Sequence, residues 1–479
     1  MANQKLALWV LTALVVGNMV GSGIFMLPAT LAQSASPLGV MSAWLLTGVG
    51  VLLIALVFGN LATRKPSLSG GPQLYAMALF KPGSERSRLS GYLVSWGYWV
   101  ANFAGNVAII TTFASYLSTF FPILSSEAVW MQVGSFDLKV GNSLTFLVCS
   151  ALLWAMHALI LRGVEGAGKT NLVATTTKVL GFAFFLIVAL FAFEKSNLVP
   201  LVAPRTADGG ATIGLLGQIN GAAISTLWAF VGVESAVVFS SRARKQQDVK
   251  RATIIGLLIA LVIYMGITAL VMGVLNQDRL IAADKPLVDA LSAVVGDTGA
   301  YIMAALGLIS LLGSTIGWIM LSSEVPYQAA KQGIFLKQFL KENKKGAPTT
   351  ALWITNLMSQ LFIFSTILKS VSSAFSFVIL IATLAYLVPY IIASLYQLKL
   401  VLSGETYLGQ ARNRVVDGVI AALATAYSIW MIKAGTADIE TFLLGIAMLV
   451  VGIIFYPLVY REKREWRAFI SEQMQKRSA

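Results

Sequence analysis

The sequence predicts an all-α polytopic membrane protein. Its 479 residues are 57% hydrophobic and 12% charged, and their mean hydropathy is +0.77. A soluble protein carries about a quarter charged residues. The hydrophobic residues gather in runs of roughly 20, the length that an α-helix needs to cross a bilayer. Two of these runs have glycine at their centres, which indicates broken helices around a site at the membrane midplane.

Twelve apolar runs are long enough to be membrane spans. An even number places both termini on one side of the membrane. With the termini in the cytoplasm, 27 of the 35 lysines and arginines lie inside, as the positive-inside rule requires. We therefore expect a multi-pass protein of the inner or plasma membrane. The spans lie near residues 7–33, 38–62, 90–116, 141–161, 171–193, 215–241, 252–275, 299–323, 350–368, 372–396, 414–432 and 440–460.

The first span contains the stretch GNMVGSGIFMLP at residues 17–28. Its three small residues, Gly21, Ser22 and Gly23, weaken a helix because glycine costs about 1 kcal/mol in a helix interior relative to alanine. Irregular backbone at membrane depth is tolerated where it is buried in protein or lines a cavity. The stretch therefore predicts a break that lines a small polar site. Alternatively, Gly17 and Gly21 form a GxxxG packing face on an unbroken helix.

The sixth span contains WAFVGVESA at residues 228–236, with Gly232 at its centre. The second interrupted helix comes five spans after the first. Because five is an odd number, the second unit of five must be inverted relative to the first. We expect one five-helix repeat over residues 1–200, a second over 201–400, and two further spans with a cytoplasmic tail over 401–479.

Two ionisable residues lie well inside spans. Glu234 follows the break in the sixth span, and Lys178 lies about two turns into the fifth. A charge near the bilayer centre costs at least about 2.5–3.5 kcal/mol, so it is usually paired or functional. Glu234 is either functional or part of a buried structural pair. Lys178 either has a role at the site or extends its ammonium group to the membrane surface.

The ends of the broken helices indicate the kind of ligand. The helix N-terminus after Gly21 presents free N–H groups that suit a carboxylate. The helix end before Gly232 presents free carbonyls that suit an ammonium group. Together they fit the backbone of an α-amino acid. The rest of the site can be lined by Trp228, Trp318, Asn102 and Asn106. The alternative for each tryptophan is a position that faces lipid or the membrane interface, which is more common.

Other classes of function are not supported by the sequence. The stretch GVEGAGKT at 163–170 fits the phosphate-binding pattern GxxxxGK[ST], but it connects two membrane spans instead of a strand and a helix. The basic residues follow membrane topology, so we expect no nucleic acid and no nucleotide as partner. One cysteine and one histidine cannot build a metal cluster. We expect no metal, no cofactor and no enzymatic activity.

Five motifs together resemble the basic amino acid/polyamine antiporters of the amino acid–polyamine–organocation superfamily. The likeness extends along the whole chain, and the most similar members are the arginine/ornithine, arginine/agmatine and lysine/cadaverine exchangers. The motifs are GNxxGSGIFxLPA at 17–29, YWxAxxxGN at 98–106, WxFxGVES at 228–235, GW at 317–318 and LVPY at 387–390.

The resemblance implies the leucine-transporter fold, with 5+5 inverted repeats and two extra helices. It places Asn18 among the substrate-binding residues. Ser22 and Gly23 would hold the carboxylate of the substrate, and the carbonyl of Val231 would hold its α-amino group. Trp228 would close the site from one side.

The resemblance also assigns the distal part of the site and its gate. Ala101, Asn102 and Asn106 would meet the cationic head of the substrate, and Trp318 would stack on its aliphatic or guanidinium part. The gating or proton-sensitive residues would be Glu234, with Tyr98 and Tyr390.

Two positions depart from the pattern of the cationic exchangers. Lys178 resembles a lysine that, in sodium-independent relatives, takes the place of a sodium ion between the first and eighth helices. Ala382 stands where the arginine/agmatine exchanger has a serine that contacts the guanidinium group. The first departure argues against sodium coupling, and the second leaves open the choice among arginine, lysine and ornithine.

The sequence thus predicts a sodium-independent exchanger of cationic amino acids that works by alternating access. Its partners would be an amino acid substrate, a counter-substrate, the lipid bilayer and, where transport is coupled to them, protons. The alternatives are a proton-coupled importer of neutral amino acids and, more remotely, a non-transporting membrane receptor. The sequence does not decide between a monomer and a homodimer.

Overall fold

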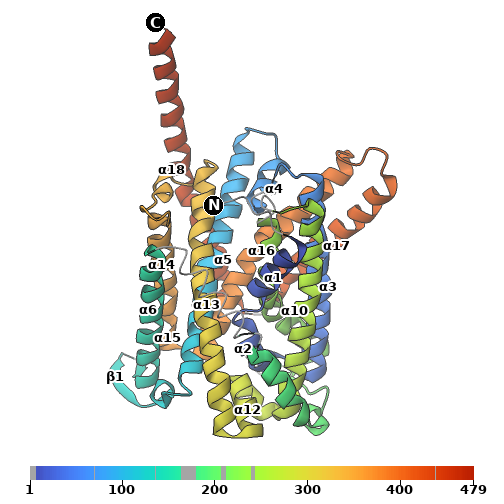
Figure 1. Ribbon diagram of the computed structural model, residues 1–479, viewed down its shortest axis with the longest axis vertical. Coiled ribbons are helices and arrows are strands. Elements are labelled where there is room, and N and C mark those ends of the chain that lie inside the picture. The colour runs from blue at the N-terminus through green and yellow to red at the C-terminus, as the bar shows by residue number, and fades with distance from the viewer. Residues whose placement is uncertain are drawn as a thin grey trace.

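The computed structural model describes residues 7–68, 71–134, 136–162, 178, 180–206, 212–238, 243–436 and 438–478. Within these ranges the protein is a bundle of long α-helices, most of which run along its longest axis (Figure 1). The last helix, α18 (Ile439–Ser478), extends beyond the rest of the bundle at its C-terminal end. The predicted all-α polytopic class is confirmed.

Nine helices in the described ranges are long and apolar enough to cross a membrane, and a tenth span is formed if the bent pair α1 (Leu8–Met19) and α2 (Gly23–Ser34) is counted as one. The nine are α3 (Pro37–Arg64), α5 (Glu85–Leu117), α6 (Val140–Leu161), α10 (Gln246–Val274), α13 (Asp297–Lys331), α14 (Thr349–Ile363) with α15 (Ser365–Leu368), α16 (Val371–Ser403), α17 (Ala411–Gly435) and the first part of α18.

The two other predicted spans, 171–193 and 215–241, both include residues outside the described ranges. An apolar helix at Leu180–Phe191 lies in the first of them. The second holds α8 (Leu215–Ala229) and the short helix α9 (Ser235–Val238). The count of twelve spans therefore stays a prediction.

Short elements connect the long helices. Two antiparallel hairpins pair β1 with β2 and β3 with β4. Helix α4 packs against α5 and α16, and α12 packs against α13. The bounds of these elements are α4 (Pro72–Leu79), η1 (Pro122–Ser125), β1 (Val129–Val133), β2 (Phe136–Lys139), η2 (Lys195–Leu198), β3 (Arg205–Thr206), β4 (Thr212–Ile213), α11 (Gln277–Ile281), α12 (Pro286–Val295) and η4 (Lys337–Leu340).

Helix α5 lies at the centre of the bundle. It packs against α16 and α13 along much of its length, and also contacts α6, α14 and α18. In the most apolar 18-residue stretch of each helix, 89% of the residues of α5 are buried inside the protein, against 33% in α6 and 17% in α18. A helix this enclosed has few positions that face lipid. Polar side chains on α5 are therefore directed at other helices, which makes α5 suited to carry a site.

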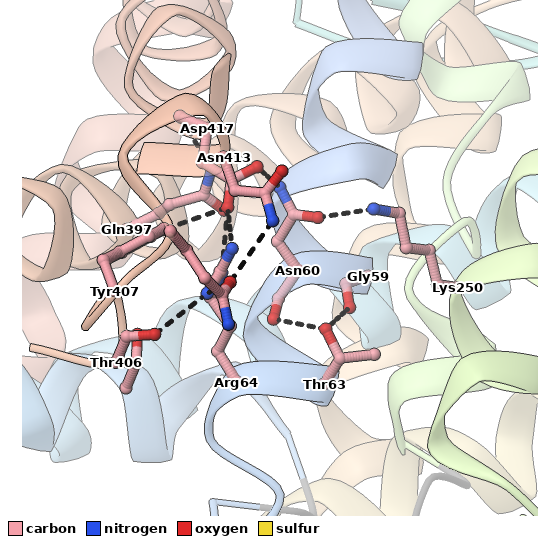
Figure 2. A network of polar contacts seen from close by, with 11 residues as sticks. Gly59, Asn60, Thr63, Arg64, Lys250, Gln397, Thr406, Tyr407, Asn413 and Asp417 are labelled. Atoms are coloured by element: carbon pink, nitrogen blue, oxygen red, sulfur yellow. Dashed lines mark hydrogen bonds and ion pairs between the residues drawn. The ribbon is translucent and has the colours of Figure 1, made fainter. Parts of the chain in front are cut away.

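A polar network joins four helices at one end of the bundle (Figure 2). Asn60 of α3 donates through Nδ2 to Oδ1 of Asp417 on α17, at 2.9 Å, and its Oδ1 accepts from Lys250 Nζ of α10, at 2.7 Å. Gln397 Nε2, near the end of α16, donates to the backbone oxygen of Asp417 at 2.8 Å. Asp417 is only 7% exposed. The network therefore fixes α3 and α10 to α16 and α17.

Candidate functional site

The first helix is broken where the sequence predicts. Helix α1 ends at Met19 and α2 begins at Gly23, and their axes differ by 44°. Ser22 is the N-cap residue of α2 and is buried, and in the described part of the chain its Oγ has no hydrogen-bond partner. The alternative of an unbroken helix with a GxxxG face is wrong. The break leaves a polar hydroxyl and the first N–H groups of α2 together in the protein interior.

The second break lies against the first. Helix α8 ends at Ala229 and α9 begins at Ser235. Between them Gly232 has φ +105°, a backbone conformation that favours glycine. A Cβ atom at this position would also lie 3.2 Å from the backbone carbon of Asn18. Glycine is therefore needed at position 232 for two reasons: its backbone conformation and the close contact between the two breaks.

Tyr264 of α10 bridges the two breaks. Its hydroxyl oxygen lies 2.7 Å from the carbonyl oxygen of Met19, at the end of α1, and 2.7 Å from that of Ala229, at the end of α8. Its ring stacks on Trp44 of α3, with centroids 5.1 Å apart. Tyr264 could not be identified from the sequence, since a tyrosine within an apolar span gives no local signal for such a contact.

A small cavity separates the two breaks. Its volume is about 10 Å³, which is room for about one water molecule. The rings of Trp228 and Trp318 lie 5.9 Å apart beside it. A Cβ atom on Gly105 would lie 2.9 Å from Trp228 and 3.2 Å from Trp318, so both indoles pack against a bare backbone. The cavity is too small to hold an amino acid. The lining is Asn18, Met19, Gly21, Ser22, Gly23, Ile109, Trp228, Ala229, Val231 and Trp318.

Two asparagines of α5 lie near this cavity, on either side of Gly105 along the helix. Asn102 donates through Nδ2 to the carbonyl oxygen of Tyr98 at 2.6 Å, and Asn106 accepts through Oδ1 from Ser322 Oγ of α13 at 3.1 Å. Both are fully buried. Within the described residues, Asn102 Oδ1 and Asn106 Nδ2 have no hydrogen-bond partner. Each amide therefore keeps one polar atom available for a ligand.

Glu234 joins the second break to α5 and α16. Its Oε1 accepts from the hydroxyl of Tyr98 at 3.1 Å, and its Oε2 accepts from the hydroxyl of Tyr390 at 2.9 Å. Oε2 also accepts from the backbone N–H of Gly232 at 3.2 Å. The side chain is 2% exposed. The carboxylate thus links the second break to α5 and α16. Glu234 does not line the small cavity.

Lys178 connects the first break to α13. Its Nζ donates to the carbonyl oxygen of Val20 at 2.6 Å and to Ser314 Oγ at 3.2 Å. Lys178 is buried, so its ammonium group stays inside the protein and does not extend to the surface. The carbonyl of Val20 is one of the groups that the break leaves unpaired within the helix. Lys178 therefore satisfies it with a charged donor.

A larger cavity opens next to the site. This vestibule has a volume of about 600 Å³ and is lined by residues of α2, α8, α11, α16, α17 and α18. It is mostly polar, and it reaches Ser225, three residues before Trp228 on α8. Trp228, one turn further along α8, lines the small cavity. Charged residues on its wall are Asp284, Lys369 and Asp438.

The predicted site residues fall into four groups. Asn18, Ser22, Gly23, Trp228, Val231 and Trp318 line the small cavity. Asn102 and Asn106 lie nearby on α5, while Ala101 is buried on the same helix and does not line the cavity. Glu234, Tyr98 and Tyr390 form a separate cluster, and Lys178 lies behind the first break. The stretch 163–170 lies outside the described residues.

Comparisons with known proteins cover nearly the whole chain. The family model described as "Amino acid permease" matches residues 6–458. The "Putative arginine/ornithine antiporter" of Bacillus subtilis (strain 168) is 54% identical over 456 residues, which are 95% of this chain and 97% of that protein. The "Arginine/ornithine antiporter" of Pseudomonas aeruginosa is 37% identical over 467 residues, 96% of this chain and 92% of that protein. The protein of the same name from Latilactobacillus sakei is 32% identical over 454 residues, with coverages of 95% and 90%.

Proposed function

Because the chain belongs to the amino acid permease family, we propose that it exchanges cationic amino acids across the membrane by alternating access. The single observation that carries this proposal is the similarity to arginine/ornithine antiporters, at 54% and 37% identity over at least 95% of the chain. The predicted resemblance to the basic amino acid antiporters is confirmed. Arginine, ornithine and lysine are the substrates that we expect, without sodium.

The two breaks would hold the backbone of the substrate. The N–H groups at the start of α2, with Ser22 Oγ, favour a carboxylate, because a helix N-terminus carries a partial positive charge. The carbonyl groups near Val231 favour the α-amino group. Asn18 and Gly23 complete this part of the site. This assignment is supported by the small cavity, which these residues line together although their two helices are about 200 residues apart in the sequence.

The rest of the site would hold the substrate side chain. Trp318 offers an aromatic face to a cation, worth about 0.5–2 kcal/mol. Ala101, Asn102 and Asn106 would lie around the distal charged group. Trp228 would act as the lid towards the vestibule, because it lines the small cavity one helical turn from Ser225, which lines the vestibule.

Glu234, Tyr98 and Tyr390 would form the gate on the other side of the site. Hydrogen bonds to a carboxylate are roughly twice as strong as those between neutral groups, so two tyrosines on two helices can hold the passage closed. Lys178 would take the place of a bound cation behind the first break. Its ammonium group already binds the carbonyl of Val20, which supports transport without sodium.

The orientation follows from the basic residues. We assign both termini and the Arg64 end of the bundle to the cytoplasm, and the vestibule to the outside of the inner or plasma membrane. The units 1–200 and 201–400 would be the inverted repeats. On this assignment the vestibule would open towards the outside, and the gate at Glu234 would close the cytoplasmic side.

Counterflow in proteoliposomes tests the proposal. Vesicles loaded with unlabelled arginine, without sodium, should take up labelled arginine, and lysine or ornithine should compete. Empty vesicles should take up little. Uptake only into empty vesicles under an inward proton gradient, with competition by alanine and leucine, would instead show a proton-coupled importer of neutral amino acids.

A further inference from the structure

The vestibule has room for an amino acid, unlike the small cavity between the two breaks. Its volume is about 600 Å³, within the range of about 300–1,000 Å³ that is usual for pockets that bind small molecules. The volume of the small cavity is about 10 Å³. In this conformation a substrate molecule therefore fits in the vestibule and does not fit between the breaks.

Three charged side chains line the vestibule, and two of them are acidic. Asp284 follows α11, Asp438 precedes α18 and Lys369 precedes α16. All three are exposed, and in the part of the chain that the structure describes none of them forms a salt bridge. Lys285, the neighbour of Asp284 in the sequence, donates to Ser118 Oγ at 3.2 Å instead. The vestibule thus presents two negative charges and one positive charge to a ligand.

The start of α16 adds hydroxyl groups next to Lys369. Ser372 is only 8% exposed, and among the described residues its hydroxyl forms no hydrogen bond. The N-terminus of a long helix carries a partial positive charge and favours a carboxylate. With Lys369 beside it, this part of the wall suits an anionic group. The serines of α16 that line the vestibule are Ser372, Ser373 and Ser376, and Ser370 is the N-cap residue.

We propose that the vestibule is a second binding site, which holds a cationic α-amino acid before it reaches the site between the breaks. Such a molecule carries two positive charges and one negative charge, the reverse of the charges on the wall. Asp284 and Asp438 would bind its two cationic groups, and Lys369 with the start of α16 would bind its carboxylate. A neutral amino acid would leave one of the two aspartates without a partner. This inference deepens the proposed function and rests on it.

Protection of a cysteine in the vestibule tests the second site. Ser376→Cys places a thiol in the wall, where a water-soluble methanethiosulfonate should modify it. Cys149, the native cysteine, is buried and should not react. Lysine should slow the modification at lower concentration than norleucine, which lacks only the distal amine. Ser403→Cys, at the exposed far end of α16, is the control, and neither amino acid should slow its modification.

Asp284→Asn combined with Asp438→Asn tests the two negative charges. An asparagine at 438 can still accept from the backbone N–H of Thr441, which Asp438 Oδ1 binds at 3.0 Å, so α18 stays capped. In this background about tenfold more lysine should be needed to protect the thiol of Ser376→Cys, the value of one hydrogen bond to a charged group. The concentration of norleucine should not change. Asp297→Asn, at the exposed start of α13, should leave both concentrations unchanged.

Lys369→Gln tests the other end of the ligand. Cadaverine is lysine without its carboxylate, so the substitution should shift the preference for protection towards cadaverine by severalfold. An unchanged preference would remove Lys369 from the site.

Two results would overturn the vestibule site while arginine counterflow persists. One is no protection by lysine. The other is equal protection with and without the two aspartates, which would show that binding between the breaks shields the thiol indirectly. Absence of arginine counterflow in the unsubstituted protein would instead overturn the proposed function itself.

Discussion

Arg64 and Asp417 lie 353 residues apart in the sequence and form a largely buried ion pair. The guanidinium group donates through Nε and Nη2, both at 2.8 Å from Oδ2 of the carboxylate. Tyr407 donates its hydroxyl to the same oxygen at 3.0 Å, and the guanidinium lies 3.9 Å from the centre of the Tyr407 ring. The side chains of Arg64 and Asp417 are 14% and 10% exposed. The pair is the centre of the network that joins α3 to α17 (Figure 2).

Asp417→Ala should destabilise the protein strongly. Removing one partner of a buried pair leaves the other charge uncompensated, at a cost of about 3–5 kcal/mol. Thermal unfolding in detergent measures this change. Glu405→Ala is the matched control, because Glu405 pairs with the neighbouring Lys65 but its side chain is 52% exposed. An exposed pair contributes about 0–1 kcal/mol. Equal melting temperatures for the two variants would contradict the structural importance of Asp417.

The breaks and the acidic residue of the site could be predicted because their signals are local. Gly21, Ser22 and Gly23 weaken a helix wherever the chain places them, and a carboxylate such as Glu234 inside an apolar span is costly by itself. Their partners could not be derived from the residues alone. Tyr98 and Tyr390 are 136 and 156 residues away from Glu234, and the resemblance, not the pattern, indicated them.

Contacts that depend on helix packing were missed altogether. Tyr264 bonds to both breaks, and Gly105 leaves room for two indoles, yet neither residue is unusual in a membrane helix. The ion pair of Arg64 was missed for the same reason, since a basic residue at the end of a span already agrees with topology. Only the crossing of α3 and α17 shows that this residue has a buried partner.

Glu234→Gln should slow exchange by about tenfold while the protein stays folded. The amide can still accept from one tyrosine, but a neutral acceptor makes hydrogen bonds about half as strong. Arginine counterflow over a range of pH measures the effect. Glu324→Gln, on α13 and outside the cluster, should exchange at the normal rate. Unchanged kinetics of Glu234→Gln at every pH would remove Glu234 from the mechanism.

Lys178→Met should abolish most exchange. The substitution keeps an apolar side chain of similar length but removes the donor that satisfies the carbonyl of Val20 and contacts Ser314. Counterflow with and without sodium distinguishes two outcomes. If the ammonium group acts as a fixed cation, sodium will not restore transport. Restored uptake in sodium would show that a mobile cation can bind there. Lys433→Met, which changes an exposed lysine, is the control.

Trp318→Leu should weaken cationic substrates more than neutral ones. A cation–π contact contributes about 0.5–2 kcal/mol, or roughly twofold to thirtyfold in affinity. Competition by arginine and by leucine against labelled arginine compares the two classes in one assay. Equal losses for arginine and leucine would show that Trp318 serves only to pack against Trp228.

Asp289→Asn should change how stability depends on pH. Burial raises the pKa of Asp289 on α12 from 3.8 to about 6, against the opposing effect of Lys285. Between these two values the folded protein binds more protons at Asp289 than the unfolded chain, so this group makes the protein less stable as pH rises from 4 to 6. The variant should gain melting temperature relative to the unsubstituted protein at pH 8 and not at pH 4. A difference that is the same at both pH values would contradict this.

The contact of Tyr264 with both breaks has a consequence for the barrier between states. A phenol carries one hydrogen, whereas the carbonyl oxygens of Met19 and Ala229 lie equally close to it, at 2.7 Å. The two acceptors therefore compete for one hydrogen, and neither holds a full bond. When one half-helix moves away, the hydrogen passes entirely to the other carbonyl, so the bond weakened on one side is recovered on the other. On the proposed cycle, separating the half-helices would therefore cost less than breaking two independent hydrogen bonds, and Tyr264 would keep one hydrogen bond in either position.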